Sequence, residues 1–161
     1  MDIISEIGIK NTSIKYTDRP TVKVIIRNED KILILNNGLL PGGGVDSGES
    51  ETVAIERELL EELGAIVSNV EPIATVIQYR DFLEKRYIVN GFTADLSSMD
   101  TATSPQDEGE SNFTYEWYDK NAAIELVKRS ISSYDSMAIR DDSQQGKLFN
   151  LKTTLEFLRR I

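Results

Sequence analysis

The chain has 161 residues, 40% of them hydrophobic, and its 27 acidic residues against 18 Lys and Arg give a net charge of −9. A chain of this length can bury one core, so we expect a single domain over residues 1–161. The chain contains no Cys and no His, which excludes disulfides, thiolate nucleophiles, histidine-metal sites and Ser-His-Asp triads. The excess of acidic residues argues against binding to nucleic acid polymers or to anionic membranes.

No apolar run approaches membrane-spanning length, and the N-terminal segment lacks the basic-then-apolar pattern of a signal peptide. We therefore expect a cytoplasmic protein without a membrane partner. Hydrolytic chemistry in a chain without His and Cys must use carboxylates, metal-bound water, Lys or Tyr.

The first predicted elements are two strands in residues 21–36, on either side of a turn at 28–31. A glycine-rich loop follows at 40–49. Its glycines allow close approach to a ligand, and their N–H groups can bind phosphate oxygens. Taken alone, the glycine run is equally compatible with a simple turn.

A helix is predicted next, because the sequence from Ser50 to Leu63 has no Gly or Pro and is rich in Glu, Leu, Ala and Arg. Ser50 can cap its start, and Gly64 can end it in a left-handed turn. At about 100° per residue, one broad side of this helix is apolar and the other is acidic. The apolar side comprises Val53, Ile55, Leu59, Leu60 and Leu63, and the exposed acidic side comprises Glu58, Glu61 and Glu62.

Three neighbouring carboxylates repel one another, so this acidic side requires compensation. Arg57 lies four residues before Glu61 and can reach Glu49 across the turn, where its planar guanidinium would orient carboxylates. A divalent cation would compensate more strongly, because Mg²⁺ and Mn²⁺ prefer carboxylate oxygens. The alternative is a solvated acidic helix face without a ligand.

The remaining elements follow the helix. Residues 97–112 are rich in Ser, Asp, Thr, Gly and Glu and predict a loop. Alternation of Phe113, Tyr115 and Trp117 predicts a strand with one apolar face. Further strands are predicted at 68–80 and 84–96, and further helices at 122–130 and 148–160.

Residues 43–65, GGVDSGESETVAIERELLEELGA, follow the spacing G-x5-E-x7-R-E-U-x-E-E-x-G-U, where U is apolar. Only Ala65 departs from it, since a larger aliphatic residue is usual there. This segment resembles the signature of the Nudix (MutT-like) hydrolases. The resemblance implies an α/β fold of the Nudix type, an α/β/α sandwich. In that fold the signature helix and terminal helices pack on a curved mixed β-sheet.

The resemblance also implies a chemistry, namely hydrolysis of a pyrophosphate bond with Mg²⁺ or Mn²⁺ as cofactor. In the family, the loop-helix unit binds the cations that bridge the diphosphate of the substrate, and water attacks phosphorus. The metal ligands would then be Glu58, Glu61 and Glu62. Glu58 and Arg57 would serve catalysis, Arg57 by holding the carboxylates in place. Substrate binding would fall to Gly42, Gly43, Gly44 and Glu49.

Two further candidates lie outside the signature. Family members often supply another carboxylate from the region of the 97–112 loop, where Asp107, Glu108 and Glu110 are candidates and Glu108 is favoured by position. The sequence is equally compatible with a role of these acids only in keeping the loop soluble. Tyr79 could line a base or sugar pocket, or be an ordinary strand-end residue.

The chain departs from common family patterns after the second predicted strand. Gly38 stands where an aromatic residue is often found, and Asn36 and Asn37 stand where Arg is common. These differences argue against stacking of a base, and against binding of a phosphate by Arg, at the end of the second predicted strand. Lys23 and Arg27 share one strand face, but alternation does not say whether that face meets the cleft or solvent.

The function predicted from these residues is cleavage of a pyrophosphate bond in a nucleoside diphosphate linked to another moiety. The partner would be a nucleotide-type small molecule, and homodimerisation stays open. The alternatives are a house-cleaning nucleoside triphosphate pyrophosphatase and a nucleotide-sensing Nudix domain that does not cleave its ligand. The intact carboxylates argue against the sensing domain.

Overall fold

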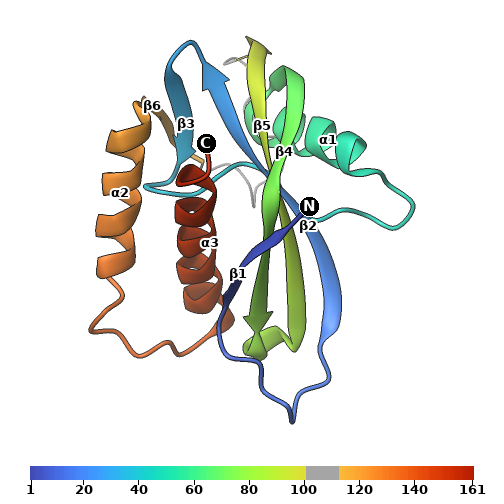
Figure 1. The fold of residues 1–161 in the computed structure, drawn as a ribbon, viewed down its shortest axis with the longest axis vertical. Helices are drawn as coiled ribbons and strands as arrows, with labels where there is room; N and C mark the ends of the chain where they lie inside the picture. The colour runs from blue at the N-terminus through green and yellow to red at the C-terminus, as the bar shows by residue number, and fades with distance from the viewer. Residues whose placement is uncertain (101–112) are drawn as a thin grey trace.

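A computed structural model of the protein describes residues 1–100 and 113–161. Within these residues the chain forms a six-stranded sheet and three α-helices (Figure 1). The strands are β1 (Ile3–Ile7), β2 (Thr17–Asn28), β3 (Lys31–Leu35), β4 (Ala65–Arg80), β5 (Lys85–Met99) and β6 (Tyr115–Tyr118). The helices are α1 (Glu51–Leu63), α2 (Lys120–Ser132) and α3 (Asp142–Leu158), with a short 3-10 turn η1 (Asp81–Leu83) between β4 and β5.

The strand order in the sheet is β1-β4-β5-β2-β3-β6. The sheet is mixed, because β1 runs parallel to β4 and β2 runs parallel to β5, whereas the other neighbours are antiparallel. Register shifts interrupt the long pairing of β4 with β5. Helix α1 covers one face, and α2 and α3 cover the other (Figure 1). The predicted α/β/α sandwich with a mixed sheet is therefore confirmed.

Strand alternation in β2 supplies a core to each face of the sheet. Val22, Val24 and Ile26 pack towards α1, whereas Ile25 packs towards α2 and α3, and all four are fully buried. On the second face the ring of Phe157 occupies the space above Gly91, where a Cβ would collide with it. The two cores hold β2 rigidly between the helical layers, and the candidate site is built along this strand.

The predicted elements occur at or near their expected positions. The largest boundary error concerns α3, which was predicted to begin at residue 148 and instead begins at Asp142. The Asp141 side chain accepts a hydrogen bond from the Gln144 N–H at 2.9 Å and caps the helix there. Strand β1 was not predicted at all. No helix in residues 1–100 and 113–161 combines the length and apolarity required to cross a membrane.

Candidate active site

The glycine-rich loop lies along the middle of β2 and is held there by backbone pairing. Three N–H···O=C bonds of 2.9–3.0 Å join the segments: Val22 to Gly43, Val24 to Pro41, and Val45 to Pro20. The backbone of the loop is thus fixed by the sheet rather than free in solvent.

Two glycines are required by this close packing. Gly42 has φ of 130°, and a Cβ on it would overlap the carbonyl of Val22. A Cβ on Gly43 would overlap the carboxyl of Glu58 from α1. The loop therefore passes between β2 and the acidic side chains of α1, with no room for side chains at either position.

Helix α1 begins and ends as predicted. The Ser50 hydroxyl accepts a hydrogen bond from the Val53 N–H at 3.2 Å, and Gly64 adopts the left-handed conformation with φ of 61°. These two caps fix the length of the helix and hence the rotational position of its carboxylates.

The predicted division of α1 into an apolar and an acidic side is wrong in part. Val53 and Leu60, which were assigned to the buried side, are 50% and 59% exposed. Glu62, assigned to the exposed side, is only 9% exposed. The helix turns a narrower stripe towards the sheet than the wheel suggested, through Ile55, Leu59 and Leu63, and Glu62 lies at the edge of that stripe.

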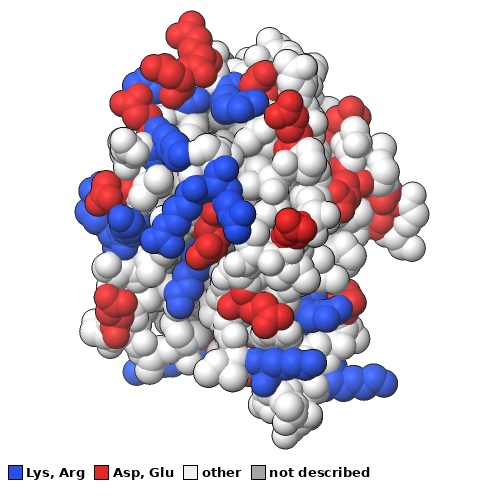
Figure 2. Space-filling model, in the orientation of Figure 1, with Lys and Arg blue, Asp and Glu red and all other residues white. Residues whose placement is uncertain are grey.

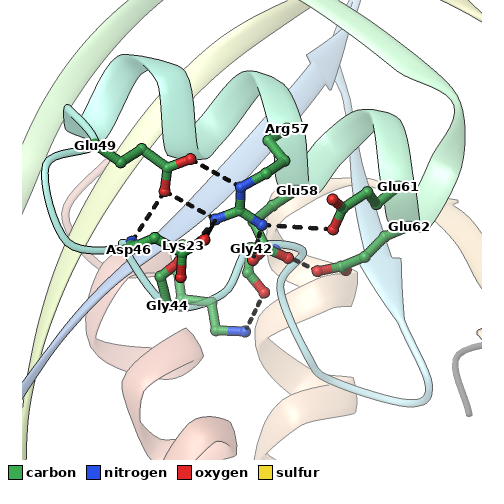
Figure 3. A network of polar contacts seen from close by, with 9 residues as sticks. All are labelled: Lys23, Gly42, Gly44, Asp46, Glu49, Arg57, Glu58, Glu61 and Glu62. Carbon is green, nitrogen blue, oxygen red and sulfur yellow. Dashed lines mark hydrogen bonds and ion pairs between the residues drawn. The ribbon is translucent and has the colours of Figure 1, made fainter.

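Arg57 forms the centre of a carboxylate network (Figure 3). Its Nε and Nη2 donate to the two oxygens of Glu49 at 2.8 and 2.9 Å, which is the planar two-bond contact expected from the spacing. Its Nη1 donates to Glu58 at 2.8 Å and to Glu61 at 3.4 Å. Nη2 also donates to the Gly44 carbonyl at 2.9 Å. Arg57 therefore ties the glycine loop to α1.

The charges in this network shift the affinity of its groups for protons. The hydrogen bond from Arg57, assisted by the backbone N–H of Asp46, lowers the pKa of Glu49 to about 2. Hydrogen bonds to Glu49 and then Glu58 raise the pKa of Arg57. Both members of the Arg57–Glu49 pair are charged throughout the physiological pH range.

Glu58 and Glu62 lie one helical turn apart and contact each other beside the loop. The Gly42 N–H donates to Glu62 Oε1 at 3.2 Å (Figure 3). Burial, and to a smaller extent the neighbouring Glu58, raise the pKa of Glu62 to about 8, although Lys23 and the Gly42 N–H act in the opposite direction.

Lys23 was left unplaced by sequence reasoning, and the structure places it in the site. Its Nζ donates to the carbonyls of Leu40 and Gly42, both at 3.2 Å (Figure 3). Burial lowers the pKa of Lys23, and the negative charges of Glu62 and Glu58 partly restore it. Strand alternation put Lys23 and Arg27 on one face of the strand, but only the tertiary structure shows that Lys23 contacts the loop. By contrast, Arg27 pairs with Asp95 at 3.2 Å, away from the loop.

The donor set of α1 suits a hard divalent cation. Glu58, Glu61 and Glu62 offer only oxygens, and the loop carbonyls add further oxygens beside them. Within residues 1–100 and 113–161, no three acidic residues already meet in the arrangement of a metal site. The three carboxylates do not converge because they have different partners. Glu61 accepts a hydrogen bond from Arg57 at 3.4 Å, whereas Glu62 accepts one from the Gly42 N–H at 3.2 Å. The residues fit a cation by chemistry and require side-chain rotation to enclose it.

The other predicted site residues lie elsewhere. Tyr79 is 6% exposed, packs against Tyr16 with ring centroids 5.3 Å apart, and donates to Glu6 at 3.3 Å. None of these contacts involves the loop. Glu108 and the alternative acids Asp107 and Glu110 fall outside the described residues.

The family model described as "NUDIX domain" matches residues 17–137, which is more than half of the chain. A curated relative, the RNA pyrophosphohydrolase of Rickettsia typhi, is 35% identical over 68 residues. That match covers 35% of this chain and only 42% of the length of the relative.

Solved structures share the fold at lower identity. A NUDIX hydrolase from Nitrosomonas europaea superposes with a TM-score of 0.58 and 18% identity, over 83% of this chain and 91% of that one. A MutT NUDIX hydrolase from Burkholderia pseudomallei gives 0.53 and 18% identity, over 65% and 85%. With the loop, the Arg57 network and the acidic helix in register, and with the family model spanning most of the chain, this protein belongs to the Nudix family.

Proposed function

We propose that this protein, as one domain over residues 1–161, hydrolyses a pyrophosphate bond in a nucleoside diphosphate linked to another moiety. One observation supports the proposal: the carboxylates of Glu58 and Glu62 lie against the backbone of Gly42 and Gly43. Arg57 hydrogen-bonds both to the loop and to Glu58 on the helix. The loop that we propose binds phosphate therefore belongs to the same hydrogen-bond network as the acids that we propose bind cations.

In the reaction, water forms a new bond to one phosphorus, and the bond from that phosphorus to the bridging oxygen breaks. Glu58, Glu61 and Glu62 would hold Mg²⁺ or Mn²⁺. When bound, such an ion neutralises phosphate charge and lowers the pKa of coordinated water. The carboxylate of Glu58 takes the proton of the attacking water, and the departing phosphate carries the bridging oxygen.

The remaining residues position these groups. Arg57 keeps Glu49 and Glu58 oriented, and Glu49 in turn accepts the Asp46 N–H at 3.0 Å and closes the loop. The N–H groups of Gly43 and Gly44 bind phosphate oxygens, and Gly42, whose N–H donates to Glu62, lets the backbone approach the substrate closely. Glu108 is proposed to supply an additional carboxylate. The acidic surroundings would repel a diphosphate, and the bound cations reverse that local sign.

A second candidate is removal of pyrophosphate from a chain of three phosphates, on a nucleotide or on an RNA end. The name of the Rickettsia typhi relative, RNA pyrophosphohydrolase, favours it. The net charge of −9 argues against extended contact with RNA. A nucleotide sensor without hydrolysis is less well supported, since the carboxylate set is complete.

The deciding experiment is a substrate screen with Mg²⁺ or Mn²⁺ and identification of products. The first proposal predicts two monophosphate-bearing fragments from a linked diphosphate. The second predicts a nucleoside monophosphate, or an RNA ending in one phosphate, plus pyrophosphate. The Glu58→Gln variant serves as the inactive control. Binding of nucleotides without any turnover would overturn both and leave the sensor.

A further inference from the structure

A cavity lies between α2, α3 and the turn that follows β3. Its volume is about 660 Å³, which is within the usual range for small-molecule sites. Asn36 and Asn37 line it from the turn, Arg129 from α2, and Lys147 from α3. The described residues that line it include no Asp or Glu.

The two cations at this cavity are available to a ligand. Both Arg129 and Lys147 are exposed, and neither has an ion-pair partner among the described residues. Lys128, the neighbour of Arg129 on α2, differs in this respect, since it pairs with Glu125 at 3.3 Å. Unpaired cations at the rim of a cavity attract anions.

The surrounding charge strengthens this attraction. Residues 120–161 contain eight Lys and Arg against five Asp and Glu, whereas residues 1–119 contain ten against 22. Figure 2 shows Lys and Arg side chains gathered over α2 and α3, while the visible charges over α1 are acidic. In a chain of net charge −9, the cavity therefore lies in a region of positive balance.

The rest of the lining suits a flat ring attached to the anion. Tyr134 and the apolar side chains of Leu126 and Leu151 offer a face for stacking and apolar contact. The backbone turn at Asn36 and Asn37 is held in place, because the Ser130 hydroxyl donates to the Asn37 carbonyl at 2.6 Å. The cavity is thus partly preformed rather than a gap between mobile segments.

This cavity also differs in position from the signature. Lys147 and Leu151 lie beyond residue 137, where the match to the family model ends. The cavity and the signature are nevertheless linked, since the turn at 36–37 continues directly into Pro41 and the glycine loop. A ligand here can act apart from the carboxylates or reach them along this segment.

We propose that the cavity between α2, α3 and the 36–37 turn binds a phosphorylated nucleoside, with the phosphate at Arg129 and Lys147 and the ring at Tyr134. The binding requires no divalent metal, because the cavity contains its own positive charge.

The test titrates ¹⁵N-labelled protein with adenosine monophosphate in EDTA, following amide chemical shifts. The shifts should move at 36–37, in the second half of α2 and in the first half of α3. The double variant Arg129→Gln/Lys147→Gln should bind about tenfold more weakly. The double variant Lys128→Gln/Lys152→Gln removes the same charge from the same helices outside the cavity and should bind within about twofold of the parent.

Three results would overturn the proposal: shifts confined to the glycine loop and α1, equal affinity in the two double variants, or no binding. The experiment does not depend on hydrolysis, so failure of the proposed function would not affect it. Kinetics with a substrate then identify the source of the ligand. A raised KM at constant kcat in the cavity variant means that the far end of the substrate binds there, whereas unchanged kinetics mean a separate nucleotide.

Discussion

The helical layers on the two faces of the sheet carry functional groups of opposite charge. Helix α1 and its glycine loop bring carboxylates together around Arg57, whereas α2 and α3 border a cavity with unpaired cations. The first region is built from residues 41–64, which are continuous in sequence. The second combines three segments that are separated by up to about a hundred residues in the chain. Local sequence therefore specified the loop and carboxylates of the first site, whereas tertiary contact adds Lys23 to it and creates the whole of the second site.

The largest expected effect is that of Glu58→Gln on the acidic side. We expect a loss in turnover of about 10²–10⁴-fold, because the variant removes the group that takes the proton of water. Steady-state rates at saturating Mg²⁺ measure it, with circular dichroism to establish folding. Glu56→Gln, which removes an exposed carboxylate from the same helix, is the matched control. A loss below about threefold would move the chemistry from Glu58 to the candidate acids Asp107, Glu108 and Glu110.

Replacing Arg57 with Lys tests whether the network requires a planar fork. Lys keeps the charge but cannot make the two parallel bonds to Glu49 or reach Glu58 and Gly44 together. We expect turnover to fall by roughly tenfold or more, as for loss of one charged hydrogen bond in the transition state. A Lys variant with full activity and parental stability would show that the fork is dispensable.

Lys23→Met tests the cation that lies beneath the loop. The variant keeps the length of the side chain but leaves the carbonyls of Leu40 and Gly42 without their donor. We expect the metal-free protein to lose about 1–3 kcal/mol of stability, measured by urea unfolding. Lys31→Met is the control, since Lys31 is exposed and pairs only with Asp119. Equal losses in the two variants would remove any special role for Lys23.

Metal titrations should separate Glu61 from Glu62. Both were predicted as ligands, but Glu62 is buried against Gly42, whereas Glu61 is exposed and 3.4 Å from Arg57. Replacement of either with Gln should weaken Mn²⁺ binding. We expect about tenfold for Glu62→Gln and less for Glu61→Gln, because the fixed, desolvated carboxylate interacts more strongly with an ion. Unchanged titrations in both variants would end the assignment of this helix as the metal site.

The sequence could predict most of the acidic region and little of the basic one, for physical reasons. Ser50, Gly64 and the absence of helix breakers between them determine α1 locally, and spacing alone put Arg57 within reach of Glu49. The burial of Glu62 depends on how the helix axis lies on the sheet, which no periodicity encodes. The site of Lys23 likewise depends on which strand face meets the loop. The cavity at Arg129 requires α3, whose start is fixed by a cap at Asp141 that the prediction missed.

The smallest expected effect concerns pH and the Arg57–Glu49 pair. The folded-state pKa of Glu49 is about 2, below its ordinary value of 4.5, so the folded protein binds a proton there less readily than the unfolded chain. The contribution of the pair to stability is therefore fully present above about pH 4.5 and is lost as the pH falls towards 2. The difference in urea midpoint between the parent and Glu49→Gln should be constant from pH 5 to 7 and shrink below about pH 4.5. Glu56→Gln gives the baseline for removal of an exposed carboxylate from this region. If the difference in urea midpoint instead grows on acidification, the folded protein stabilises Glu49 in its protonated form. The ion pair with Arg57 would then not be what stabilises this network.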